Sequence, residues 1–158
     1  MVCADLSHAE KSAEKPKIKE TIDVIDFEGQ NVSSMDAEVV SGFLRTSLVN
    51  LRIYTVVDRK NMEGILAEQG LQMTGCTTEE CAVKIGKLLN VQKIIMGNLS
   101  KLMGVYYITG NIIEIETGQI TESKRVKSVS GGELAESVDK LAKELAGMDS
   151  EDDAVVSV

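Results

Sequence analysis

Two cysteines five positions apart, Cys76 and Cys81, are the residues of this chain best placed for thiol chemistry. Cys76 precedes a predicted helix and Cys81 falls in its first turn, so the Cα atoms can lie within the roughly 4.4–6.8 Å that a disulfide requires. A bridge here closes a short loop, and its main effect is to fix the entry of the helix. The alternative is a pair of reduced thiols in a cytosolic protein. A zinc site is disfavoured, because the neighbouring sequence offers no third or fourth ligand.

Carboxylates provide the second candidate chemistry. Asp26 lies near the end of one predicted strand, and Asp58 directly follows the next. If these strands are parallel neighbours, both side chains reach the edge at which α/β proteins bind ligands. With Glu28 they could hold a divalent metal for phosphoryl transfer or hydrolysis. The alternative is structural: Asp58 caps a helix and Glu28 lies in a solvated turn. Arg59 then pairs with Asp58 or with Asp26.

Other catalytic groups are not indicated. His8 is the only histidine, and it lies in a polar segment far from any predicted core, which disfavours histidine-dependent catalysis. Gly131 and Gly132 precede a helix, but no Lys-Ser or Lys-Thr follows, and Glu133 would repel an anion. The leading prediction is therefore no catalytic residue, no cofactor and no metal ligand, with the metal site at Asp26 and Asp58 as the alternative.

Composition restricts the partners. The 158 residues carry a net charge of −8 and have a sequence pI of about 4.7. This charge argues against nucleic acid, since phosphate neutralisation by Lys and Arg supplies most of the affinity for it. No apolar run approaches the ~20 residues that a membrane-spanning helix needs. We therefore expect a protein partner, further copies of this chain, or both, and no transmembrane span.

The two ends differ from the middle. Residues 1–19 are rich in Lys, Glu and Ala and contain the only proline, so they are predicted to be a flexible leader or tether. Cys3 is a lipidation candidate there, the alternative being an ordinary cysteine of the leader. Residues 148–158 are predicted to be an acidic disordered tail. Their apolar carboxyl end, at Val158, could also add to the sheet edge of a PDZ domain.

Between the ends, residues 20–147 alternate between strand and helix periodicity. The pattern predicts strand, helix, strand, helix, helix, three strands and helix. Helix starts are predicted at Ser33 or Ser34, at Asp58, and at capping boxes of Thr77 with Glu80 and of Ser130 with Glu133, and helix ends at Gly70, Asn90 and Gly147. The strands are predicted at Ile22–Phe27, Ile53–Val57, Gln92–Met103, Val105–Glu116 and Gln119–Val129.

These elements predict one α/β domain. The first two strands should be parallel because a helix connects them, and the last three should form an antiparallel meander. The result is a mixed sheet of about five strands with helices packed on its faces. Charged residues in the last strand suit an edge position.

The chain resembles the CsgG-like group of bacterial envelope proteins, which includes the curli secretion component, the amino-terminal domain of TolB, and LpoB. The resemblance covers nearly all of residues 20–147. It rests on the order and spacing of short segments: Ile22–Phe27, Leu44–Leu48, Val56–Met62, Ile65–Gly70, Ile85–Leu89, Ile95–Leu99 and Ile113–Ile120.

The resemblance implies a non-enzymatic accessory protein of the cell envelope, periplasmic or associated with the outer membrane. It would act in secretion, assembly or envelope biogenesis through contacts with an envelope protein or with copies of itself. It also implies an oxidising compartment, where Cys76 and Cys81 should pair. Two alternatives remain: a metal-dependent hydrolase using Asp26 and Asp58, and a cytosolic ligand-binding regulatory domain.

Overall fold

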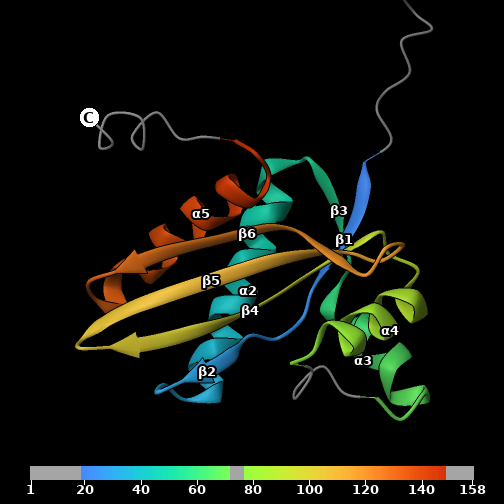
Figure 1. The fold of residues 1–158 in the computed structure, drawn as a ribbon, viewed down its shortest axis with the longest axis horizontal. Helices are drawn as coiled ribbons and strands as arrows, with labels where there is room; N and C mark the ends of the chain where they lie inside the picture. The colour runs from blue at the N-terminus through green and yellow to red at the C-terminus, as the bar shows by residue number, and fades with distance from the viewer. Residues whose placement is uncertain (1–18, 72–76, 149–158) are drawn as a thin grey trace, which may run out of the picture.

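The computed structural model describes residues 19–71 and 77–148 (Figure 1). Within these ranges one mixed sheet of six strands is flanked by helices, which confirms the predicted α/β fold. The elements, in chain order, are β1 (Glu20–Val24), β2 (Glu28–Gln30), α2 (Ser34–Leu51), β3 (Tyr54–Val56), α3 (Arg59–Glu68), α4 (Glu79–Leu89), β4 (Lys93–Leu102), β5 (Val105–Glu114), β6 (Gln119–Ser128), the 3₁₀ turn η1 (Gly131–Glu133) and α5 (Leu134–Leu145). In this part of the chain, no helix combines the length and the apolar character that crossing a membrane requires.

The strands run in the order β3-β1-β4-β5-β6. Strand β1 is parallel to both β3 and β4, as the connecting helices require. Strands β4, β5 and β6 form the predicted antiparallel meander, with β6 at the edge.

Strand β2 was not predicted. It runs parallel to β4 and places Glu28 opposite Asn98 and Gln30 opposite Ser100. Glu28 is exposed, as the structural alternative predicted, but it lies in a strand and not in a turn. The segment Glu-Gly-Gln has no apolar alternation, so only its pairing with β4 makes it a strand.

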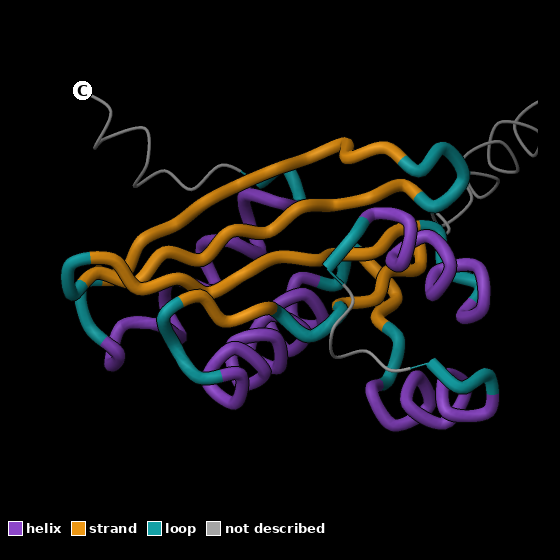
Figure 2. Tube along the Cα trace, turned by 60° about the horizontal axis from the view of Figure 1, so that its bottom comes forward, coloured by secondary structure: helices purple, strands orange, loops and turns teal. Residues whose placement is uncertain are grey.

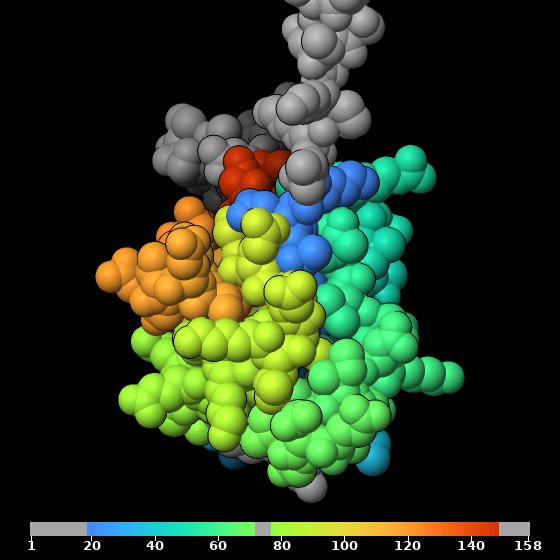
Figure 3. All heavy atoms as spheres, turned by 90° about the vertical axis from the view of Figure 1, so that its right-hand side faces the viewer, coloured from blue at the N-terminus to red at the C-terminus, as the bar shows by residue number. Residues whose placement is uncertain are grey.

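The sheet separates two cores, and Figure 2 shows the helices packed against it. Helices α2 and α5 cover one face and enclose the large core, formed by Ile22, Val24, Phe27, Ala37, Val40, Leu44, Leu48, Ile95, Leu99, Ile108, Ile112, Val126, Val138, Leu141, Ala142 and Leu145. Helices α3 and α4 lie side by side at one end of the molecule (Figure 3). They enclose the small core, formed by Ile25, Met62, Leu66, Ala82, Ile85, Val91, Ile94, Ile113 and Ile115.

Two helix starts agree with the prediction. The Ser33 hydroxyl accepts a hydrogen bond from the Asp36 N–H at 3.1 Å and caps α2. The Asp58 carboxylate accepts one from the Asn61 N–H at 3.3 Å and caps α3. Each side chain satisfies a backbone donor that the first turn leaves without a partner.

Two predicted capping boxes are wrong. Helix α4 is capped by Thr78, whose hydroxyl accepts from the Cys81 N–H at 3.1 Å, one residue later than predicted. Ser130 makes no capping hydrogen bond through its side chain to the described residues, and the 3₁₀ turn η1 lies between it and α5. Its carbonyl instead accepts a hydrogen bond from the Ser128 hydroxyl at 2.7 Å.

Candidate functional site

The sheet has one face that α3 and α4 cover only in part. Along β4 and β5, buried residues such as Leu99 and Ile108 point into the large core. Their neighbours point to the opposite side, since side chains alternate across a strand. We call this surface the open face; it is formed by Glu28, Gln30, Met96, Asn98, Ser100, Tyr107, Thr109, Asn111, Ser123 and Arg125.

Hydrogen bonds between strands order the polar side chains of the open face. The Ser100 hydroxyl donates to Gln30 Oε1 at 2.8 Å, and the Ser123 hydroxyl donates to Asn111 Oδ1 at 2.6 Å. Arg125 Nε donates to Thr109 Oγ1 at 3.2 Å. Because the amide oxygens accept these bonds, the amide NH₂ groups are left to donate to a ligand.

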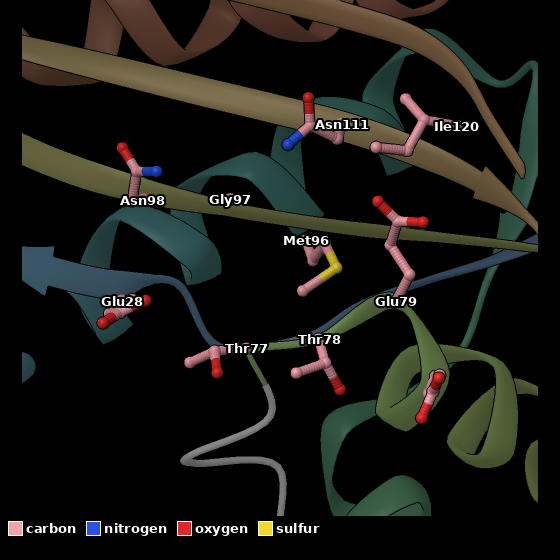
Figure 4. Close-up of a pocket in the computed structure, with 10 residues that line it drawn as sticks. Glu28, Thr77, Thr78, Glu79, Met96, Gly97, Asn98, Asn111 and Ile120 are labelled. Atoms are coloured by element: carbon pink, nitrogen blue, oxygen red, sulfur yellow. The ribbon is translucent and has the colours of Figure 1, made fainter.

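A pocket of about 510 Å³ lies where the open face meets the start of α4 (Figure 4). Its walls come from β2, β4, β5 and β6 and from the residues that cap and begin α4. The lining residues are Glu28, Thr77, Thr78, Glu79, Glu80, Met96, Gly97, Asn98, Asn111 and Ile120. The pocket thus offers amide and hydroxyl groups beside three carboxylates.

A second hollow, of about 450 Å³, continues across the open face. It shares Asn98 with the first pocket and extends to Tyr107 and Arg125. Together the two hollows form a polar depression with carboxylates at one end and a guanidinium at the other. Such a surface can bind an extended segment through many hydrogen bonds.

The predicted ligand-edge residue Asp26 is instead neutralised by two arginines. Its Oδ1 lies 3.1 Å from Arg45 Nη2 and its Oδ2 lies 3.0 Å from Arg59 Nη2. Arg45 also donates to the Val24 carbonyl at 2.6 Å, and Arg59 Nε contacts Glu63 Oε1 at 2.8 Å. The structure thus brings Asp26 and Arg59 together, as one predicted alternative had it, and adds Arg45.

The other two residues of the hypothetical metal site lie elsewhere. Asp58 caps α3, and Glu28 lines the pocket on the open face. Within residues 19–71 and 77–148, no group of three or more His, Cys, Asp or Glu side chains is arranged to hold a metal ion. Asp26 already accepts from two cations, so a metal would have to displace them.

The cysteine predictions fall partly outside the described residues. Cys3 and Cys76 both lie there, while Cys81 lies in the first turn of α4 and donates its N–H to Thr78. The pairing of Cys76 with Cys81 and the lipidation of Cys3 therefore stay predictions.

Asp23 is completely buried, although its place in the sequence indicated no special role for it. It lies between Ile22 and Val24, which enter the large core, so its side chain points toward the small core. Neither carboxylate oxygen makes a hydrogen bond of normal geometry to any residue that the structure describes. Burial raises the pKa of Asp23 to about 6, although the charge of Arg45 and the Val24 N–H oppose the shift.

We expect Asp23→Asn to stabilise the protein at neutral pH. Between about pH 4 and 6 the folded state holds a proton on Asp23 that the unfolded state, in which the carboxyl has its ordinary pKa of 3.8, has released. The contribution of Asp23 to the free energy of unfolding therefore falls as the pH rises through that range. Above about pH 6 this contribution has fallen by about 3 kcal/mol. Asn cannot ionise, so we expect a gain of about 1–3 kcal/mol near pH 7.5.

Urea unfolding of both proteins at about pH 4.5 and 7.5 measures this gain. The difference between variant and wild type should grow with pH. Asp36→Asn, at an exposed position of α2, is the control and should not show this growth. Parallel pH profiles for Asp23→Asn and wild type would contradict the prediction.

The sequence also matches a family model, described as curli production assembly/transport component CsgG, over residues 4–103. This is more than half of the chain. The chain belongs to the CsgG family. The resemblance drawn from the short segments is thereby confirmed, and no curated protein sequence matches this CsgG-family chain.

Solved structures share the fold of this CsgG-family chain at low sequence identity. The LpoB C-terminal domain from Escherichia coli is 16% identical, with a TM-score of 0.61 over 77% of this chain and 93% of that one. Lipoprotein GNA1162 from Neisseria meningitidis is 10% identical, with a TM-score of 0.60 over 80% and 96%. A PelC dodecamer from Paraburkholderia phytofirmans is 13% identical, with a TM-score of 0.53 over 82% and 87%. At these identities the likeness establishes the fold.

Proposed function

We propose that this CsgG-family protein is a non-enzymatic accessory protein of the bacterial cell envelope. It binds a partner protein of the envelope and acts in secretion, assembly or envelope biogenesis. It resides in the periplasm or at the outer membrane, with Cys3 as its lipid attachment site and a disulfide between Cys76 and Cys81.

The open face is the observation that carries this proposal. Its polar groups are held in fixed positions by hydrogen bonds between strands, and it is hollowed by two adjoining pockets. Many weak donors and acceptors over an extended surface suit a protein segment better than a small substrate, which needs a more enclosed cavity. The partner segment should carry basic residues, because Glu28, Glu79 and Glu80 line one end.

Family and fold neighbours support the envelope assignment. The family description names curli production, assembly and transport, and one structural neighbour is named a lipoprotein. Another neighbour is named a dodecamer, which is consistent with a fold that works through protein contacts.

Site-specific photo-cross-linking in the native host tests the proposal. A photoreactive residue at Asn111 lies in the pocket, whereas the control position Glu136 is exposed on α5, against the opposite face of the sheet. We expect a discrete adduct with an envelope protein from position 111 and none from position 136. An additional Asn98→Arg change, which fills the depression shared by both hollows, should abolish the adduct.

Fractionation of the same cells, with an intact-mass measurement of the purified protein, tests the location. We expect the protein in the envelope fraction, with lipid on Cys3 and with the mass loss of two hydrogens from the disulfide. A cytosolic protein without lipid and with reduced thiols would contradict the envelope assignment and favour the regulatory alternative. Equal adducts from both positions would instead contradict the open face as the docking surface.

A further inference from the structure

The charged residues of the open face are divided between its two edges. Glu28 lies on β2, at one edge of the face, whereas Arg125 and Lys127 lie on β6, at the other. All three residues are exposed, and no ion pair joins them to another residue that the structure describes. By contrast, Lys124 on the opposite side of β6 pairs with Glu122. The open face therefore presents unneutralised charges of opposite sign at its two edges.

Strand pairing places Glu28 and Arg125 in one row across the sheet. Glu28 lies opposite Asn98 of β4, which lies opposite Thr109 of β5. Thr109 in turn lies opposite Arg125 of β6. Figure 4 shows Glu28 and Asn98 on their two strands, with Asn111 beyond them on β5. Three spacings between neighbouring strands separate the two charged residues, or about 14 Å at about 4.8 Å each.

Both hollows of the open face extend across the strands in the same direction as this row. The first reaches from Glu28 on β2, over β4 and β5, to Ile120 on β6. The second reaches from Gln30 on β2, over the same two strands, to Arg125 on β6. The hollows join at Asn98, which lines both of them. One occupant can therefore contact the negative and the positive edge at the same time.

The middle of the open face suits the backbone of a peptide. Asn98 Oδ1 accepts a hydrogen bond from the Ser100 hydroxyl at 3.2 Å, and Asn111 Oδ1 accepts one from the Ser123 hydroxyl. Both amides therefore present their NH₂ groups as donors, which backbone carbonyls can accept. A charged side chain over this polar strip would lose water without gaining a countercharge. The charges of an occupant should therefore lie over the two edges.

We infer that the partner segment is extended, crosses the strands, and carries one basic and one acidic residue about four positions apart. An extended chain advances about 3.3 Å per residue, so about four residues span the row. Residues four apart in such a chain also point to the same side, here toward the sheet. The basic residue binds Glu28, with Glu79 and Glu80 in the same hollow. The acidic residue binds Arg125, with Lys127 on the same side of β6.

This charge pattern excludes segments of a single sign. A wholly basic segment would be repelled by Arg125 and Lys127, and a wholly acidic one by Glu28. The inference rests on the proposed function, because it takes the open face as the docking surface. It adds the charge pattern of the partner segment and the direction in which this segment lies.

Nuclear magnetic resonance titrations of the full chain with short peptides test the charge pattern. The probes are peptides of Ser and Thr with a lysine and an aspartate four positions apart, in either order, and matching peptides with two lysines or two aspartates. Salt at about 0.15 M screens the net negative charge of the protein beyond about 8 Å. We expect the mixed peptide, in its better order, to bind at least about fivefold more tightly than both like-charged peptides. It should shift the side-chain amide resonances of Asn98 and Asn111.

A second set of titrations tests the spacing and the positive edge. A mixed peptide with its charges three positions apart should bind several-fold more weakly, because its two charged side chains point to opposite sides. Arg125→Glu should make the two-lysine peptide bind best, since both edges are then negative. Its matched control is Lys124→Glu, the same change at the adjacent position on the opposite side of β6, which should leave the order of affinities unchanged. Both variants should keep the circular dichroism of wild type.

Three results would overturn the inference: like-charged peptides that bind as tightly as the mixed ones, no binding by any peptide, or an unchanged order of affinities in Arg125→Glu. If the photoreactive residue at Asn111 still yields its adduct in host cells, the proposed function stands without this inference. If that adduct is also missing, the proposed function fails with it.

Discussion

Gly97→Ala should abolish or severely weaken folding. A Cβ at this position of β4 would lie 1.9 Å from the Thr109 carbonyl oxygen and 3.1 Å from Phe27 Cζ. The backbone oxygen cannot move without separating β4 from β5, which pair over their full lengths in the centre of the sheet. We expect a loss of more than about 3 kcal/mol, a large part of the total stability of a domain of this size.

Urea unfolding, together with the yield of folded protein, measures the effect of Gly97→Ala. The matched control is Gly64→Ala in the interior of α3, where a Cβ meets no atom of the described residues within 4 Å. Alanine favours helix over glycine, so the control should gain about 0.5–1 kcal/mol. A Gly97→Ala protein within about 1 kcal/mol of wild type would show that the strands can separate locally at little cost.

The second large effect is expected for Arg45→Met. Arg45 connects the Val24 carbonyl to Asp26, whose side chain is only 2% exposed. Without Arg45, the Asp26 carboxylate stays buried with one cation in place of two. We expect a loss of about 3–5 kcal/mol in the free energy of unfolding, as for other buried ion pairs that lose one partner.

Arg59→Met is the comparison for Arg45→Met. The Arg59 side chain is 36% exposed, and Asp26 keeps its contact with Arg45 in this variant. The loss should therefore be about 1 kcal/mol or less. Adding Asp26→Asn to Arg45→Met should recover part of the stability, because no uncompensated charge then remains. Equal losses for the two arginine variants would contradict the central role of Arg45.

The main architecture followed from local patterns. Leu99 and Ile108 alternate with polar neighbours and thereby predict half-buried strands, and Asp58 predicts the start of α3 from its type and position alone. The resemblance to the CsgG-like group added the family. These features depend on residues close together in sequence, which is why one sequence sufficed to predict them.

The features that were missed depend on distant partners. Arg45 meets Asp26 across 19 positions of sequence, and nothing in the helix pattern of α2 distinguishes it from a surface arginine. Asp23 has the position of the polar member of an alternating strand, but α3 and α4 pack over that side of β1. The candidate site was therefore only partly predicted. Glu28 was considered as a metal ligand beside Asp26, whereas it lines the pocket. The open face could be recognised only from the pairing of the strands.

The division into two cores implies that the protein does not loosen uniformly. The α3–α4 layer is held mainly by a few buried side chains, such as Met62, Leu66 and Ile85. It lies on the side of β1 toward which Asp23 points, and with a pKa of about 6 this buried carboxyl is ionised at neutral pH. Opening of this layer should therefore require less free energy than global unfolding, and its amide hydrogens should exchange earlier than those of β4 and β5. Because the start of α4 forms one wall of the pocket, this wall can adjust to a partner while the sheet beneath it stays rigid.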